Sequence, residues 1–352
     1  MLTSSAKEFL LNLLSTPTPS GEEWIGQKNF CEYVKPYATK IEIDEIGNAV
    51  AIHNPEASFK VLLAGHADEI AFMVKQIDDN GFVYVEKVGG ISPKVAIGMK
   101  AHVLGKKILH GVFGVNAQHH GGVKESFSED DLFLDLGAKC KADVEKYVSI
   151  GDFIVYDRLP IELLNKRLSG RGLDNRTGQF IIAESFKQAV EKGAKVGIYA
   201  ASTVNEETNM GGAHFVAARH EPTIAIACDV TFATDYPGVN TRKHGVVSLN
   251  GGPVLAKGAP IHPIVNNMLE EIAKEKDIPL QYELTPRATG TDADKMRVAG
   301  KGVPVALVSL PLRYMHSPVE TASLEDIEKE IELLVAFLCS LNGDESLLPY
   351  TI

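Results

Sequence analysis

The sequence predicts an α/β protein with a mixed, mostly parallel sheet sandwiched by helices and an inserted β-rich domain. Two observations predict this class. Helical and strand-like segments alternate along the second half of the chain, which is typical of a parallel sheet covered on both faces. Between residues 69 and 165, short β-like pieces are instead separated by glycines at close intervals. We therefore expect one α/β domain formed by residues 1–68 and 166–352, interrupted by a β-rich domain at 69–165.

The segment before the insertion begins with a helix, because Phe9, Leu10, Leu13 and Leu14 recur on one helical face. A stretch rich in proline, serine and threonine then ends this helix. A later apolar run, bounded by polar residues, is typical of a strand buried on both faces. The elements expected after the first helix are a second helix at 22–34 and strands at 41–52 and 60–65.

The rest of the chain divides into the β-rich insertion and a second alternating part. The strand-like pieces of the insertion are 82–88, 107–115, 132–136 and 153–156. After residue 170 helices and strands alternate again, as in the first part. The helices expected there are 178–190, 211–219, 262–276 and 324–341, and the strands are 196–202, 223–228 and 303–310.

The composition excludes several classes of partner. A chain of 352 residues with 45% hydrophobic residues can bury a sizeable core without disulfides. Its formal net charge of -11 and the lack of a basic stripe argue against nucleic acid. No run reaches about 18 apolar residues, so we expect no membrane span, and the N-terminus does not resemble a secretory signal. The four scattered cysteines indicate reduced thiols, and we expect a cytoplasmic protein.

Residues of the types that bind metals lie at the ends of four predicted buried strands. In chain order they are His66 with Asp68, Glu206 with Glu207, Asp229, and His316. Ligands of open α/β sheets bind outside the carboxyl ends of the strands, so these four ends are expected to converge on one site.

A further acid, Asp174, stands in the glycine-rich loop at 170–178, directly before a predicted helix. The loop lacks the features of a phosphate-binding motif. With Asp174 the candidate ligands number five, His66, Asp174, Glu207, Asp229 and His316. Two metals share five ligands evenly only if one carboxylate bridges, and Asp174 is the natural bridge. Each ion then has about three protein ligands and an open position for a shared water, as a catalytic site requires.

Two acids remain outside this ligand set. Glu206 is adjacent to a ligand but is not needed for coordination, and we interpret it as the general base that a water attacking an amide requires. Asp68 comes two residues after His66 and is interpreted as the carboxylate that accepts the second imidazole proton and fixes the tautomer. Both are therefore expected to serve catalysis without binding a metal.

Other polar residues have simpler explanations. His119 and His120 are adjacent and point in opposite directions in an extended segment, so a loop surface is favoured over a shared metal. The acidic run at 129–131 is expected to be a solvated loop. For Asp292, which follows Gly290 and Thr291, a place in the substrate pocket and an ordinary helix cap remain equally open.

These residues resemble one family, the dinuclear-zinc TET or glutamyl (deblocking) aminopeptidases, which are cytosolic metallopeptidases. The resemblance covers nearly the whole chain, and its most specific parts are the Asp174 loop and the segment ending at Glu320. The matching segments are Gly65–Ile70, Leu173–Gly178, Glu206–Glu207, Cys228–Thr231 with Asp235–Gly238, Gly290–Asp292 and Arg313–Glu320.

The resemblance implies a peptidase domain with an inserted β-barrel-like dimerisation domain. It also implies dimers that assemble into a hollow tetrahedral dodecamer and remove N-terminal residues from short peptides. Two divalent ions per subunit are implied, zinc or alternatively cobalt. One ion would take His66 and Asp229 and the other Glu207 and His316, with Asp174 between them and Glu206 moving the proton.

The chain departs from the family pattern at two places. Asn205–Asn209 replaces the usual Gln-Glu-Glu-Val-Gly, and residues 116–122 lack the expected Pro-His. The implied metal ligands are unchanged, whereas the substrate pocket and assembly contacts are less certain to follow the family.

Three other functions compete with an aminopeptidase. In related carboxypeptidases and deacylases the extra domain lies between the fourth and fifth ligands, whereas the β-rich stretch here lies between His66 and Asp174. A scaffold that has lost its metals is disfavoured because all the ligands are present. An endoglucanase is ranked last, because a carbohydrate cleft needs aromatic residues and the chain has one Trp.

Overall fold

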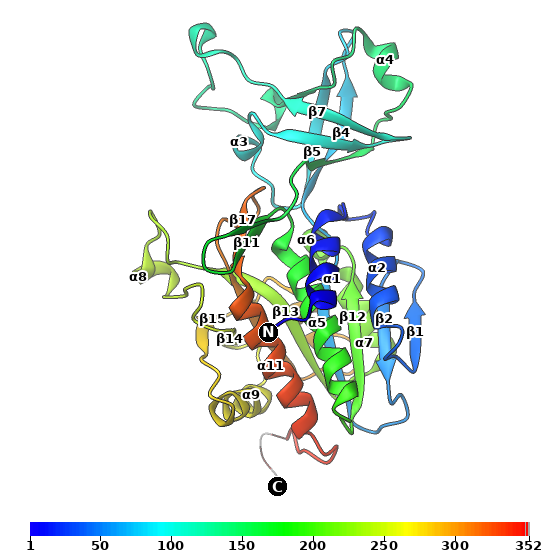
Figure 1. Ribbon diagram of the computed structural model, residues 1–352, viewed down its shortest axis with the longest axis vertical. Helices are drawn as coiled ribbons and strands as arrows, with labels where there is room; N and C mark the ends of the chain where they lie inside the picture. The colour runs from blue at the N-terminus through cyan, green and yellow to red at the C-terminus, as the bar shows by residue number, and fades with distance from the viewer. Residues whose placement is uncertain (349, 351–352) are drawn as a thin grey trace.

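Apolar runs form the centre of an eight-stranded sheet in the computed structural model, which describes residues 1–348 and 350 (Figure 1). In spatial order the strands are β1 (Lys40–Ile43), β2 (Ala49–His53), β12 (Gly197–Thr203), β3 (Lys60–His66), β13 (Ile224–Phe232), β16 (Val305–Leu312), β14 (Val254–Lys257) and β15 (Gln281–Leu284). The four strands from β12 to β16 are parallel, and β2 and β14 run antiparallel to them. The expected mixed sheet with a parallel centre is confirmed.

Helices cover both faces of this sheet, because successive strand residues point to opposite faces. Val61 and Leu63 of β3 belong to one apolar cluster, whereas Leu62 and Ala64 belong to the other. The first face carries α1 (Ser4–Ser15), α2 (Trp24–Val34), α5 (Leu173–Glu191), α9 (Pro263–Glu275) and α11 (Leu324–Ser340), and the second carries α7 (Gly211–His220) and α10 (Asp292–Arg297).

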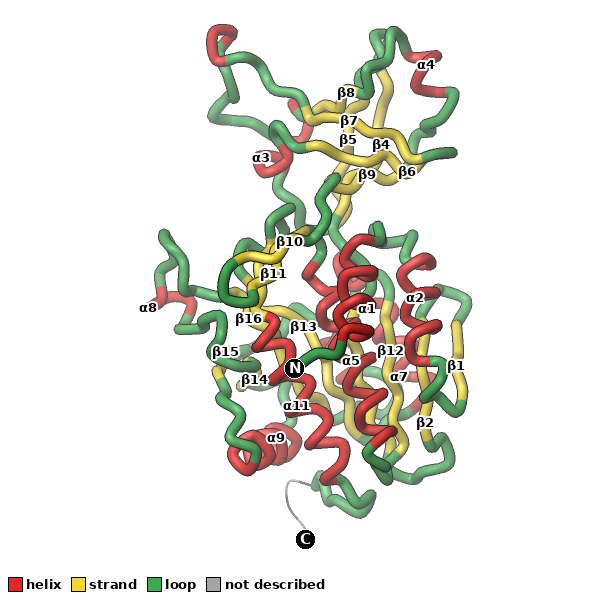
Figure 2. Tube along the Cα trace, in the orientation of Figure 1, coloured by secondary structure: helices red, strands yellow, loops and turns green. Residues whose placement is uncertain are grey.

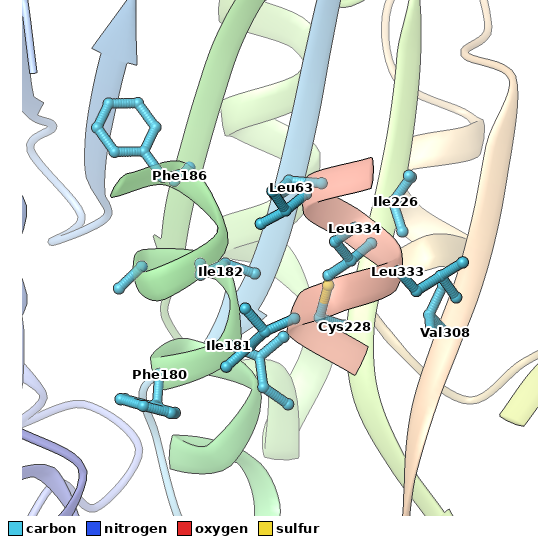
Figure 3. Packing of buried hydrophobic residues seen from close by; sticks show 14 of the residues in the cluster. Leu63, Phe180, Ile181, Ile182, Phe186, Ile226, Cys228, Val308, Leu333 and Leu334 are labelled. Carbon is cyan, nitrogen blue, oxygen red and sulfur yellow. The ribbon is translucent and has the colours of Figure 1, made fainter. Parts of the chain in front are cut away.

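The larger core lies between the sheet and the first helical layer. Figure 3 shows side chains of α5 and α11, among them Ile181 and Leu334, packed against Leu63 of β3 and Ile226 of β13. All four side chains are fully buried, and each such burial contributes about 1.5–3 kcal/mol to folding. This packing fixes the start of α5 against the carboxyl ends of β3 and β13.

The inserted segment forms a closed six-stranded barrel, which lies above the sheet in Figure 1. Around the barrel the strands are β4 (Ala71–Ile77), β5 (Val83–Val88), β8 (Phe133–Asp135), β7 (Ile108–Phe113), β6 (Lys100–Leu104) and β9 (Phe153–Tyr156). Its interior is a separate apolar cluster that includes Phe72, Phe113 and Tyr156. Short helical turns occur in its connections, at α3 (Pro93–Ala96), α4 (Lys141–Glu145), Gln118–His120 and Glu129–Asp131.

A small antiparallel sheet joins the barrel to the α/β body, as Figure 2 shows. Its strands are β10 (Ile161–Leu163), β11 (Arg167–Gly170) and β17 (Glu320–Ser323). The remaining short helices are α6 (Glu206–Asn209) and α8 (Thr241–His244). No helix within the described residues is long and apolar enough to cross a bilayer.

One expected strand is wrong in detail. The segment 41–52 forms two strands, β1 and β2, because a tight turn separates them. The Asp44 carboxylate accepts hydrogen bonds from the backbone N–H groups of Ile46 and Asn48, and Gly47 supplies a φ of +101°. Apolar residues recur on both sides of the turn, so the apolar pattern alone predicts one continuous strand.

Candidate metal centre

The carboxyl ends of the parallel strands bring the five candidate metal ligands together. His66 is the last residue of β3, and Glu207 is the second residue of α6, which follows β12. Asp174 stands at the start of α5 with non-helical dihedral angles, and His316 lies in the loop between β16 and β17. Asp229 lies inside β13 and not beyond it as expected, because β13 continues to Phe232.

Close packing of α5 against the strands positions Asp174. A Cβ atom on Gly65 of β3 would lie 2.7 Å from the backbone of Gly178, and one on Gly178 would lie 2.4 Å from the carbonyl oxygen of Cys228. Glycine is therefore required at both positions. The side chain of Asn175 stabilises this packing of α5 against β13. Its amide NH₂ donates to the carbonyl oxygen of Cys228, and its oxygen accepts from the N–H of Gly178.

The ligand atoms form two trios that share Asp174. The first is His66, Asp174 and Asp229, and Nε2 of His66 lies 3.3 Å from Oδ1 of Asp174 and 3.8 Å from Oδ1 of Asp229. The second is Asp174, Glu207 and His316, and Nε2 of His316 lies 3.3 Å from Oδ2 of Asp174 and 3.4 Å from Oε2 of Glu207. Asp174 thus turns one oxygen toward each imidazole.

The donor chemistry of these trios fits divalent metal ions. Imidazole nitrogens and carboxylate oxygens are zinc ligands, and Oε1 of Glu207 is buried without a hydrogen-bond partner among the described residues. Burial raises the pKa of the Asp229 carboxyl to about 8, and burial together with repulsion from Asp174 raises that of Glu207. Such crowded carboxyl groups need positive charge nearby to ionise, and divalent cations supply it.

Glu206 lies beside the trios without belonging to either. Its Oε2 atom is 3.7 Å from Nε2 of His66, and only 9% of its side chain is exposed. Burial and the neighbouring carboxylates of Asp229, Asp292 and Asp174 raise the pKa of the Glu206 carboxyl to about 10, although His66 opposes this. A carboxyl in this position can accept and return a proton at the centre of the site.

Asp68 connects His66 with the segment that carries both glutamates. Nδ1 of His66 lies 3.3 Å from Oδ1 of Asp68 and 3.1 Å from its carbonyl oxygen, which leaves Nε2 directed at the trio. The Asp68 carboxylate also accepts hydrogen bonds from the N–H groups of Glu206 and Glu207 and from the hydroxyl of Ser20. Asp68 is fully buried, and these hydrogen bonds with the neighbouring His66 hold its pKa low despite the burial.

Glu320 is a positioning residue that the sequence reasoning missed. Its carboxylate accepts from the N–H of Asp174 at 3.2 Å and from the N–H of His316 at 2.8 Å, so it joins the two segments that supply the second trio. His316 has a φ of +60°, and this hydrogen bond helps to hold it in the left-handed region. The only sequence signal is the place of Glu320 at the end of the matching segment that contains His316.

A buried ion network beneath the site was also missed. Glu69, three residues after His66, pairs with Arg171 and Arg176 from the loop around Asp174. The guanidinium of Arg176 donates to both carboxylate oxygens of Glu69, at 2.8 and 3.0 Å. The two arginines lower the pKa of Glu69 to about 2 although burial opposes the shift. The network therefore joins the end of β3 to the start of α5.

The barrel contributes backbone to the site. After β5 the chain passes over the second trio at Gly89 and Gly90, and a Cβ on Gly90 would lie 2.7 Å from Nδ1 of His316. That nitrogen is 3.2 Å from the carbonyl oxygen of Gly90, which fits a protonated Nδ1 and leaves Nε2 free for an ion.

The structure separates the remaining candidates. His119 and His120 are exposed in a helical turn of the barrel and belong to none of the possible metal-binding groups among the described residues. Thr291 caps α10 and lines the cavity described below, whereas Asp292 is buried behind it and accepts from the hydroxyl of Thr203 at 2.5 Å. Both interpretations therefore apply to Thr291, and neither applies to Asp292.

A third group with metal-binding chemistry lies on the outer surface of the barrel. His102 and His110 are partners on β6 and β7, and Asp157 follows β9. His110 is 78% exposed, and its Nδ1 lies 3.9 Å from the Asp157 carboxylate. The buried trios at the sheet differ from this group because they open on a cavity of about 640 Å³.

The mixed sheet, the imidazole and carboxylate donors at its carboxyl edge and the inserted barrel define a class, the metal-dependent exopeptidases of α/β fold. The family described as M42 glutamyl aminopeptidase matches residues 47–333, and the chain belongs to this family. It is a metal-dependent aminopeptidase, as expected from the resemblance.

Individual relatives agree with this assignment. The chain is 33% identical over 345 residues to a lysyl aminopeptidase of Pyrococcus furiosus, covering 94% of this chain and 96% of that protein. A TET aminopeptidase from a Thaumarchaeota archaeon superimposes with a TM-score of 0.90 at 27% identity, covering 96% of this chain and 98% of that one. Pyrococcus horikoshii TET1 peptidase, which can assemble into a tetrahedron or a large octahedral shell, gives 0.85 at 29% identity, with 96% and 100% covered.

Proposed function

We propose that the chain removes the N-terminal residue from short peptides with the help of two divalent ions bridged by Asp174. The observation that carries this proposal is the pair of 3.3 Å distances from the two Asp174 oxygens to Nε2 of His66 and to Nε2 of His316. A carboxylate between two imidazoles has the arrangement of a bridging ligand.

In this proposal one ion is held by His66, Asp174 and Asp229 and the other by Asp174, Glu207 and His316. Zinc suits the donor set, and cobalt is the alternative. The bound ions would supply Lewis-acid polarisation of the scissile carbonyl and lower the pKa of a water at the site. Asp174, Glu207, Asp229 and His316 line the cavity, which would give water and substrate access to bound ions.

The protein side chains perform the proton transfers and the orientation. Glu206 takes a proton from the attacking water and returns it to the leaving amine, and its burial keeps solvent from competing for that proton. Asp68 holds the tautomer of His66 and, through its hydrogen bonds to the backbone of α6, keeps Glu206 facing the centre. Glu320 holds the backbone of Asp174 and His316 at a constant separation.

The competing functions receive less support. Family membership favours an aminopeptidase over a carboxypeptidase, a deacylase or a scaffold. Phe232 is the one aromatic residue that lines the cavity among the described residues, and Trp24 is exposed on α2. A carbohydrate cleft would need aromatic stacking surfaces, so an endoglucanase remains the least supported function.

The enzyme is a homo-oligomer by analogy with its relatives, and we propose dimers that assemble through the barrel into a tetrahedral dodecamer. Ile108 and Val112 of β7 are 55% and 47% exposed on the outside of the barrel. We expect these exposed apolar side chains to contribute to the contact between subunits. The four free cysteines are consistent with the reducing cytoplasm, where we propose that the enzyme acts.

Metal counting combined with activity tests this function. The chelator-treated protein should be inactive. Adding back Zn²⁺ or Co²⁺ should restore hydrolysis of an aminoacyl p-nitroanilide, and the activity should reach its maximum when two ions are bound per chain. The same substrate with an acetylated amine should not be hydrolysed. Asp174→Asn should lower the affinity for both ions, because the shared ligand loses its charge.

His110→Ala is the matched control, since it removes the most exposed ligand of the barrel group. It should leave the two activating ions and the activity unchanged. Full activity with one ion per chain, or equal loss of ions in both variants, would overturn the bridged arrangement.

A further inference from the structure

A partly buried carboxylate lines the cavity away from the candidate ligands. Glu283 is on β15, at the edge of the sheet, and its side chain reaches back toward the central strands. Oε2 accepts a hydrogen bond from the hydroxyl of Thr231 on β13 at 2.5 Å, and Oε1 accepts one from the hydroxyl of Ser309 on β16 at 3.0 Å. Two strands of the parallel centre thus hold the carboxylate in place.

The surroundings of Glu283 leave its charge without a partner. Burial raises the pKa of this carboxyl, and only the two hydroxyl groups lower it. Among the described residues, no lysine, arginine or histidine pairs with it. Each carboxylate oxygen accepts up to two hydrogen bonds, so each retains capacity for one more donor. A partly buried carboxylate that faces a cavity without a counter-charge is stabilised when a cation binds beside it.

Thr231, two residues after the candidate ligand Asp229 on β13, connects the metal centre with Glu283. Asp229 and Thr231 are two residues apart on β13, so both point to the same face and their Cα atoms are about 7 Å apart. The Glu283 carboxylate lies one hydrogen bond beyond Thr231. A lysine side chain reaches about 6 Å from its Cα through four methylene groups. An N-terminal lysine whose backbone lies at the ions can therefore bring its ammonium group to this carboxylate.

We propose that Glu283 forms the base of the pocket for the first residue of the substrate and selects lysine and arginine there. The proposal rests on the proposed function, because the pocket is defined by its distance from the ions. The walls of the pocket suit an aliphatic stem with a polar end, since Phe232 and Leu307 line it together with Thr231.

Lys295 is the alternative determinant, and it would select acidic residues. It lines the same cavity from α10, but the side chain is exposed, so water screens its charge. Glu283 is partly buried and held by two hydroxyl groups, so water screens its charge less than that of Lys295. The structure therefore assigns selectivity to Glu283 rather than to Lys295.

The experiment compares kcat/KM for Lys, Arg, Leu and Glu p-nitroanilides with the zinc-loaded enzyme. The wild type should prefer Lys and Arg over Glu by a factor of about 100. Glu283→Gln keeps the size and the hydrogen-bond acceptor, and it should lower the Lys value about 10- to 100-fold while the Leu value changes less than about threefold. Glu283→Asp keeps the charge on a shorter side chain. It should therefore retain more of its kcat/KM for the Arg substrate, whose side chain is longer, than for the Lys substrate.

Glu270→Gln is the matched control, because Glu270 pairs with Lys257 at 2.6 Å on the neighbouring β14 and does not line the cavity. It should leave the ratio of Lys to Leu hydrolysis unchanged. A wild type that hydrolyses Leu or Glu but does not favour Lys would overturn this proposal and leave the aminopeptidase function intact. A preference for Glu that is lost in Lys295→Met would transfer the role to Lys295. Inactivity on all four substrates would instead contradict the proposed function.

Discussion

At the scale of single residues, Glu206 and Glu207 are adjacent but occupy different surroundings. Oε2 of Glu207 lies 3.4 Å from Nε2 of His316 in the second trio, whereas Oε2 of Glu206 lies 3.7 Å from Nε2 of His66 and belongs to no trio. Asp68 holds the backbone N–H of both. One short helix thus delivers a ligand and a proton acceptor from consecutive positions, and the two roles can be separated by substitution.

Glu206→Gln should retain both ions and lower kcat by a factor of about 10² to 10⁴, because the proton acceptor is lost while the ligands remain. Glu207→Gln, one residue further on, should instead weaken the binding of one ion. Steady-state kinetics together with metal analysis of both proteins distinguish the two effects. A fully active Glu206→Gln enzyme would show that another group moves the proton.

Sequence reasoning at this scale succeeds for residues whose type and position are both distinctive. His66 and Asp174 stand at a strand end and a helix entry, where ligands are expected. Glu69, Arg176 and Glu320 could not be identified in this way, because their roles depend on partners more than 100 residues away, and a buried glutamate resembles a surface one in sequence. Glu283 was missed because its partners, Thr231 and Ser309, lie on other strands, 52 and 26 residues away.

At the scale of elements, the Glu69 network determines how β3 meets α5. The strand ends with His66 and the helix has Asp174 in its first turn, so the two elements supply one ligand each to the first trio. Arg176 donates to Glu69 and also to the carbonyl oxygens of Gly172 and Arg171, which fixes the loop before the helix. Loss of this network would misplace both ligands together.

Glu69→Gln should therefore destabilise the fold by about 3–5 kcal/mol near neutral pH, since it leaves two buried guanidinium groups without their anion. The pKa of Glu69 is lowered from 4.5 to about 2, so its contribution is complete above pH 4.5 and is lost as the pH falls toward 2. The difference in melting temperature between wild type and variant should be largest at pH 7 and narrow below pH 4.5.

Glu45→Gln is the control for this experiment, because Glu45 pairs with Arg219 at the surface and its side chain is 91% exposed. It should change the melting temperature little at any pH. A Glu69→Gln protein as stable as the control variant would show that the arginines find other partners.

The elements themselves were largely predictable where apolar periodicity is strong. The first helix, the buried strand at 60–65 and α11 follow from it. The last two strands of the sheet, β14 and β15, have four residues each and did not appear in the expectation, because such short strands have no long apolar run. Asp229 was expected beyond its strand, since polarity at a buried position was interpreted as the end of the strand.

At the scale of the whole molecule, the barrel gives the chain a second surface for contacts. Ile108 and Val112 of β7 are exposed, so the α/β body does not cover them. Family resemblance and the assembly of relatives make a second copy of the chain the expected partner. The existence of a β-rich insertion was predictable from its glycines. Its barrel-like form was predictable only from the family resemblance, because closure depends on pairings between distant strands such as that of β4 with β9.

Native mass measurement should give a particle of about 460 kDa, twelve chains of 38.1 kDa. The double variant Ile108→Asp with Val112→Asp should give smaller particles, because charged groups in an apolar contact are left desolvated. Ile108→Leu with Val112→Ile keeps the apolar area and should keep the full mass. Unchanged mass in the aspartate variant, with circular dichroism like that of the wild type, would place the contact elsewhere.

The carbonyl oxygen of Gly90 belongs to the inserted domain but lies 3.2 Å from Nδ1 of His316. A tilt of the barrel on its connecting strands would therefore turn this imidazole ring. A neighbouring subunit bound to the barrel would restrict this tilt and so keep the imidazole ring of His316 in its orientation. An isolated subunit and an assembled one would then differ in catalytic activity.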